Sequence, residues 1–120
     1  MDHRIILETG IGTDLYGSDY TKAAIRAVND AIRHSSLTLL TELSLNPAEM
    51  TVKVTIGIQE PSSLNTKRVA AELPRGNAKV TAAKGGQNIL SADGSSTTIV
   101  ATAAIEAYYP INQSGYKLSD

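Results

Sequence analysis

"TGIGTDLYGSDYTKAAI", residues 9–25, places three glycines and two aspartates between a short apolar run and an amphipathic segment. The apolar run, residues 4–8, ends close to glycine, which is typical of a central strand that is covered on both faces. Over residues 19–34 the apolar side chains recur with helical spacing, and Ser18 or Asp19 can cap the first turn. We therefore predict a strand, a glycine-rich loop and a helix.

The rest of the chain predicts three more strands and two more helices. The last two strands are expected to pair antiparallel, and the helix between the first two favours a right-handed crossover onto parallel neighbours. The connection over 84–96 is rich in Gly, Ser, Asn and Asp and is predicted to be a long loop. The predicted elements are a short helix over 37–45, a strand over 50–58, a helix from the cap Asn65 to residue 73, and strands over 78–83 and 97–109.

This order, β-α-α-β-α-β-β, predicts the α+β class: a two-layer sandwich with a mixed four-stranded sheet and the helices on one face. We expect residues 1–109 to form a single domain and residues 110–120 to form a C-terminal tail. Apolar residues make up 42% of the 120, yet Phe and Trp are absent. Small apolar side chains bury little area each, so we expect a homo-oligomer.

Charge and composition exclude several classes of partner. The chain has 11 basic and 12 acidic residues without a run of either sign, which predicts no nucleic-acid partner. The absence of cysteine excludes disulfides and thiolate catalysis. No apolar run reaches the length of a membrane span and no leader pattern is visible, so we expect no membrane partner and a cytoplasmic location.

Two phosphate-binding motifs fail at the glycine-rich stretch. A dinucleotide fingerprint needs glycine where Leu15 stands, and a nucleotide-hydrolase loop needs lysine where Ser18 stands. A helix N-terminus attracts an anion by about 0.3–1 kcal/mol. Asp14 and Asp19 would repel a phosphate 4 Å away by about 1 kcal/mol each in water and about 4 kcal/mol at an effective dielectric of 20. The stretch therefore favours a cation, a metal-bridged ligand or a neutral polar ligand.

The carboxylates point to acid–base chemistry. Glu8 ends the predicted strand and Asp14 lies in the predicted loop, so we expect them to converge at a strand end, where ligands often bind. In a shared cleft, one of the two would have a raised pKa and could act as a general acid or base. The first hypothesis is therefore a proton-transfer enzyme for a small polar metabolite (isomerisation, dehydration, cyclisation or hydrolysis). Asp14 would be the general base and Tyr16 the hydrogen-bond donor or acid, while Glu8 or Lys22 would adjust their pKa values. We expect no cofactor.

A structural interpretation competes with the catalytic one. Asp14 would then satisfy backbone N–H groups of a tight loop, Glu8 would pair with a surface lysine, and the glycines would supply positive φ angles. His34 would interact with the C-terminal dipole of its helix, and the histidine spacing predicts no metal site. The serines over 91–96, with Asp93, form either a nucleophile site or a flexible loop. The second functional hypothesis is a ligand-binding or assembly module without catalysis.

Four stretches of the chain resemble one protein family. They are ETGIGTDLYG, TKAAIRAVNDAIRHSSL, VKVTIGI and AAIEAYY, and they are similar to the Lin0512 family of conserved hypothetical proteins in bacteria and plants over residues 4 to about 108. The hallmark of this family is G-x-G-x-D-x-H-G near the N-terminus. The resemblance marks Gly10, Gly12, Asp14 and Gly17 as motif residues, and Glu8, Lys22 and His34 also look family-like. We predict Gly10, Gly12, Gly17 and His34 as ligand-binding residues. It implies no activity, because the function of the family is unknown.

The chain departs from the family motif at one position, where Tyr16 replaces the histidine. A phenol, with a pKa of about 10, does not titrate near neutral pH and is a poorer ligand for transition metals than imidazole. The exchange indicates that any metal-dependent chemistry of the motif is altered or lost in this chain.

Overall fold

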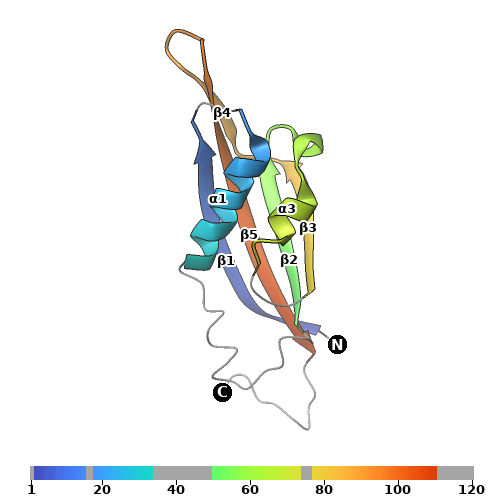
Figure 1. Ribbon diagram of the computed structural model, residues 1–120. Helices are drawn as coiled ribbons and strands as arrows, with labels where there is room; N and C mark the ends of the chain where they lie inside the picture. Colours follow the sequence, from blue (N-terminus) through green and yellow to red (C-terminus); the bar gives the residue numbers. More distant parts are fainter. Residues whose placement is uncertain (1, 16–17, 34–49, 74–76, 111–120) are drawn as a thin grey trace.

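The structure is a computed structural model, and it describes residues 2–15, 18–33, 50–73 and 77–110. The predicted helix over 37–45 and nearly all of the predicted C-terminal tail lie outside these ranges. Helices α1 and α3 lie on the same face of one mixed sheet, which confirms the α+β class and the two layers (Figure 1). The elements are β1 (Asp2–Asp14), α1 (Tyr20–Arg33), β2 (Thr51–Ile58), the 3-10 turn η2 (Pro61–Ser63), α3 (Thr66–Ala70), β3 (Asn77–Lys84), β4 (Gln87–Leu90) and β5 (Thr97–Pro110).

The sheet has five strands where four were predicted. Its order is β1-β5-β2-β3, and β4 also pairs with β5. The predicted crossover required β1 and β2 to be parallel neighbours, and this expectation is wrong. Strand β5 lies between them and runs antiparallel to both. The expected pairing of the last two predicted strands is also wrong, since β3 is parallel to β2 and lies at the edge. With 14 residues, β5 is long enough to pair with β1 on one side and with β2 and β4 on the other.

The predicted long loop over 84–96 contains strand β4. The chain leaves β3 at Gly85 and Gly86, and Gly86 has a positive φ of 61°. A Cβ on Gly86 would collide with the carbonyl oxygen of Val100, so a residue without a side chain is needed where the chain crosses to β5. We call β4, residues 91–96 and the first four residues of β5 the hairpin arm. The arm extends beyond the helices at one end of the molecule (Figure 1).

The predicted glycine-rich loop is also wrong in its first part, because Gly10 and Gly12 lie inside β1, which runs as one strand to Asp14. Among the described residues, positive φ angles occur at Ser18, Gly86 and Gly94 and not at these two glycines. Their role is therefore not conformational freedom in a turn.

Gly10 and Gly12 allow α1 to lie directly on β1. A Cβ on Gly10 would collide with the backbone of Ala27 and Ala31, and a Cβ on Gly12 with the backbone of Ala23 and Ala27. The three alanines recur every four residues along α1 and are fully buried. Helix and strand therefore pack backbone against backbone, with only methyl groups between them.

The core lies between the helices and one face of the sheet. The predicted strand over 50–58 is confirmed as β2, whose alternation buries Val52, Val54, Ile56 and Ile58 toward the helices. The predicted helix over 19–34 is confirmed as α1. Strand β1, in contrast, is an edge strand with one exposed face, so the expectation of a central strand covered on both faces is wrong.

We predict that Gly12→Ala destabilises the fold by about 3 kcal/mol, because the added methyl group must displace the backbone of α1. Thr9→Ala is the control, since Thr9 is exposed on the same strand and its change should stay within about 0.5 kcal/mol. Urea unfolding of both variants measures the difference. Equal stability of the two would show that α1 does not need the close approach.

Candidate functional site

Asp14, the predicted general base, is tied to the start of α1. Its side chain is almost completely buried, at 3% exposure of the residue. Its Oδ2 accepts the backbone N–H of Asp19 at 2.9 Å, and its Oδ1 lies 3.6 Å from Arg26 Nη1 and 3.9 Å from Lys22 Nζ. The structural interpretation of Asp14 as an acceptor of a backbone N–H is therefore confirmed.

Asp19 caps α1, and the sequence predicted either Ser18 or Asp19 in this role. Its Oδ1 accepts the backbone N–H of Lys22 at 3.0 Å, which satisfies one of the free donors of the first turn. Two carboxylates, Asp14 and Asp19, thus share this corner with two cations, Lys22 and Arg26. Both cations lie within 4 Å of Asp14, so the negative charge expected of this carboxylate is compensated there.

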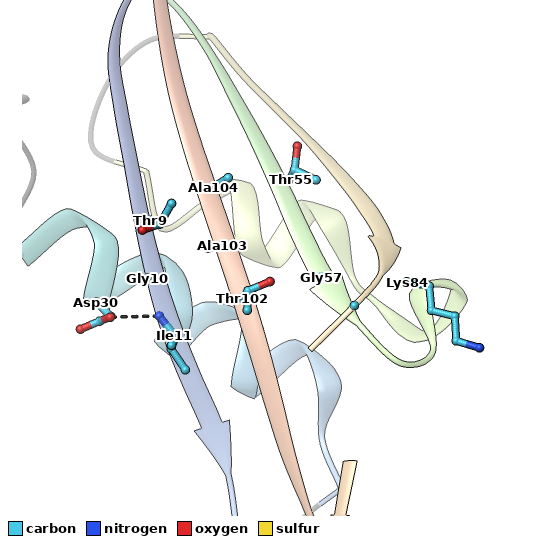
Figure 2. A pocket seen from close by; sticks show the side chains of 11 residues that line it. Thr9, Gly10, Ile11, Asp30, Thr55, Gly57, Lys84, Thr102, Ala103 and Ala104 are labelled. Atoms are coloured by element: carbon cyan, nitrogen blue, oxygen red, sulfur yellow. Dashed lines mark hydrogen bonds between the residues drawn. The ribbon is translucent and has the colours of Figure 1, made fainter. Parts of the chain in front are cut away.

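Side chains of α1 also satisfy backbone groups on the outer edge of β1. Arg26 Nη1 donates to the carbonyl oxygen of Thr13 at 2.7 Å, and Asp30 Oδ2 accepts the N–H of Ile11 at 2.9 Å. Figure 2 shows the Asp30 contact as a dashed line. An exposed edge strand is a template for pairing with another chain. The C-terminal part of β1 is therefore protected from edge-to-edge pairing.

The predicted convergence of Glu8 and Asp14 does not occur. Both residues lie on β1, six positions apart, which separates them by about 20 Å along an extended strand. Glu8 is partly buried and stands opposite Ile105 of β5. The two carboxylates remain apart because the glycines continue the strand and do not fold it back. Tyr16, Gly17 and His34 lie outside the described residues, so their predicted roles are untested.

Metal and membrane signals can be assessed for the described ranges alone. Within residues 2–15, 18–33, 50–73 and 77–110, no three His, Asp or Glu side chains are placed to hold a metal ion. In the same ranges no helix combines the length and the apolar character that a membrane crossing needs.

The sheet face that turns away from α1 and α3 is a candidate interaction surface, and we call it the open face. Strand register places four successive rows of side chains on it, and none of these residues is charged. Asp30 and Lys84 stand only at its two margins (Figure 2). From one end to the other, the rows are Thr9–Ala104–Thr55–Thr81, Ile11–Thr102–Gly57–Ala83, Thr13–Val100–Gln87 and Thr98–Ile89.

Exposed large hydrophobic side chains gather on this face. Among the described residues there are five, with exposures of 49% for Leu7, 60% for Ile11, 51% for Leu15, 49% for Ile89 and 67% for Leu90. Leu7 and Ile11 share one side of β1, and Ile89 lies on the same side of the sheet by its pairing with β5. Leu90, the next residue of β4, points to the opposite side. Several exposed apolar side chains on one face of a sheet are typical of an interaction surface.

Leu15 continues the apolar stripe of β1. Its carbonyl oxygen lies 3.5 Å from Thr98 Oγ1, which places it beside the last row of the open face. Leu7 and Ile11 lie four residues apart on the open face of β1, and the alternation of the strand, continued by one residue beyond Asp14, assigns Leu15 to the same face.

The middle of the open face is concave. A depression of about 560 Å³ lies there, with Thr9, Ile11, Thr55, Thr102 and Ala104 around it (Figure 2). Its floor is low because Gly57 has no side chain. A Cβ on Gly57 would approach Thr102 Oγ1 to 2.5 Å. The floor can thus accept methyl groups and hydroxyl groups of a partner.

One end of the open face carries charge. Glu106 Oε2 accepts the hydroxyl of Tyr108 at 2.7 Å and lies 3.3 Å from Arg4 Nη1. Lys53 stands opposite Glu106, and Lys79 stands opposite Lys53. We call Arg4, Lys53 and Lys79 the basic end. Sequence reasoning missed this cluster, although the alternation over 97–109 places Glu106 and Tyr108 on one face.

The chain belongs to the Lin0512 family of conserved hypothetical proteins, whose model matches residues 4–107. This confirms the resemblance inferred from the sequence. A crystal structure of an FtsZ-like protein of unknown function from Nostoc punctiforme PCC 73102 is similar, with a TM-score of 0.80 and 29% identity over 92% of this chain and 98% of that one. No curated protein matches the chain. The comparisons thus give a family and a fold without an activity.

We predict that Asp14→Asn lowers the free energy of unfolding by about 1–3 kcal/mol, because the neutral amide loses the attraction of Arg26 and Lys22. Glu8→Gln is the control. Glu8 forms no ion pair with a described residue, so its change should stay below about 0.5 kcal/mol. Chemical denaturation measures both. Unchanged stability of the Asp14 variant would remove its structural role.

We also predict that Glu106 titrates below its ordinary value of 4.5, because the hydrogen bond from Tyr108 and that from Arg4 lower the pKa of its carboxyl group. The stabilisation is complete above the ordinary pKa and is lost as the pH falls through the lowered one. A carbon-detected NMR titration measures the midpoint. In Tyr108→Phe the midpoint should rise toward 4.5. An ordinary midpoint in the unmodified chain would contradict the interaction.

Proposed function

We propose that the chain is a non-catalytic binding and assembly module whose working surface is the open face of its sheet. One observation carries this proposal: by strand register, three of the five exposed large hydrophobic side chains in the described ranges, Leu7, Ile11 and Ile89, lie on that single face, around rows without charge. The alternation of β1, continued by one residue, assigns Leu15 to the same face. Full burial of a leucine or isoleucine side chain is worth about 1.5–3 kcal/mol. Because these side chains are already about half covered, a partner that covers the face gains roughly half of this free energy at each of them.

The arrangement of the predicted catalytic residues supports the second hypothesis from the sequence over the first. A general base must come within hydrogen-bonding reach of the proton that it removes. Asp14 is 3% exposed and its two oxygens already contact Asp19, Lys22 and Arg26. Glu8, its expected partner, is about 20 Å away on the same strand. Proton transfer to a small polar metabolite therefore has no assembled pair of groups among the described residues.

Hydroxyl-radical footprinting tests the binding surface. We expect Leu7 and Ile11 to be oxidised readily in dilute purified protein and to be protected in concentrated protein or in an extract of the host cells. Leu90 is the internal reference, because it is exposed on the other side of the sheet and should react equally in both states. Oxidation of Leu7 and Ile11 to the same extent under all conditions would contradict the proposed function.

A further inference from the structure

We infer that a second copy of this chain covers the open face, with its strands antiparallel to those of the first copy and a two-fold axis at Ile11. The inference rests on the proposed function, since it names the partner of the same face. It is carried by the spacing of the apolar side chains, by the charges at the two ends and by the size of the face.

The apolar stripe of β1 is symmetric about Ile11. Leu7 and Leu15 lie four residues before and after it in the sequence, which corresponds to about 13 Å in each direction along an extended chain. We place the two-fold axis in the plane of the interface, perpendicular to the strands and at the level of Ile11. Rotation about this axis brings Leu7 of one copy opposite Leu15 of the other. It also places Ile11 against its own copy. The stripe is therefore complementary to itself, as a two-fold interface requires.

The middle of the face carries no charge that would oppose this packing. In a two-fold interface each group near the axis meets its own copy, so a charged patch repels itself. Thr102 and Gly57, which share the row of Ile11, are neutral and small. Two such faces can approach to the usual separation of packed sheets, about 10 Å.

Charge at the ends decides the orientation. At the basic end, Lys53 and Lys79 stand directly opposite one another, and like charges in such positions are destabilising. With parallel strands the basic ends of the two copies would meet. With antiparallel strands the basic end instead lies under the hairpin arm of the second copy, whose turn carries Asp93.

Asp93 is suited to this contact because it stays ionised. The backbone N–H of Ser95 and the hydroxyls of Ser91 and Ser95 donate to its carboxylate and lower its pKa to about 2. The predicted flexible loop or nucleophile site over 91–96 is thus a hydrogen-bonded turn that presents a fixed negative charge.

The size of the face fits a dimer. Four strands spaced by about 4.8 Å span about 19 Å, and the eight steps from Leu7 to Leu15 span about 27 Å in an extended chain. The projected area is roughly 500 Å², and the accessible area of the side chains is larger than this projection. A standard interface buries about 800 Å² on each partner, so the face is of the right order.

Cysteine cross-linking tests the arrangement, because the chain contains no cysteine of its own. Facing sheets lie too far apart for a direct disulfide, so a short bis-maleimide is the appropriate probe. We expect Ile11→Cys to cross-link to itself. Leu7→Cys and Leu15→Cys should cross-link when mixed and not when each is alone. Leu90→Cys, exposed on the other side, is the control and should give no cross-linked product with the reagent.

Sedimentation provides the second readout. The unmodified chain should sediment as a dimer, and Ile11→Lys should weaken dimerisation by at least about tenfold because two ammonium groups would meet at the axis. Leu90→Lys is the matched control and should leave the dimer intact. Self-cross-linking of Leu7→Cys would overturn the antiparallel arrangement.

The outcomes separate the inference from the proposed function. If the purified chain sediments as a monomer while Leu7 and Ile11 are protected in the extract, the dimer is contradicted and the proposed binding surface is supported. A monomer without protection in any condition would overturn both.

Discussion

The fold depends on the direct contact between the backbones of α1 and β1. Gly10 and Gly12 place no side chain between the strand and the helix. On the helix, Ala23, Ala27 and Ala31 pack against the two glycines. Because α1 lies this close, its first turns reach Asp14 at the end of β1, and its middle reaches the outer edge of the strand through Asp30. The corner that resembles an active site in the sequence is thus the attachment point of a helix.

The same contact decides where the large side chains of β1 go. Side chains alternate between the faces of a strand, so the glycines at even positions toward α1 require the odd positions to face away from it. Those odd positions hold Leu7 and Ile11. Between Leu7 and Thr13 the strand therefore has glycines at two inward positions and Leu7 and Ile11 at outward positions, which is the reverse of the usual pattern for a sheet with one covered face. The open face follows from the packing of α1.

Patterns within a short stretch of sequence predict the helices, strands and caps that depend on neighbouring residues. The alternation over 50–58, the helical spacing over 19–34 and the caps Asp19 and Asn65 are all found in the structure. The glycine motif misled the prediction, because glycine suits both a turn and a close backbone contact. The contact of Gly10 and Gly12 with the alanines of α1 distinguishes a close backbone contact from a turn, and this contact exists only in the folded chain. Strand β4 was missed since four residues between Gly-rich and Ser-rich segments carry too little periodicity.

Threonine gives the open face its particular character. It recurs on the face at Thr9, Thr55, Thr81 and Thr102, between alanine and glycine. Each threonine has a hydroxyl group that water can solvate and a methyl group that packs against a neighbouring sheet, so the face is compatible with both environments. A face of leucine and valine alone would be strongly unfavourable in water, and a face of lysine and glutamate would resist burial. A few leucines and isoleucines on a background of threonine, alanine and glycine are stable in water and are further stabilised by a partner, which is the balance that a surface for reversible association requires.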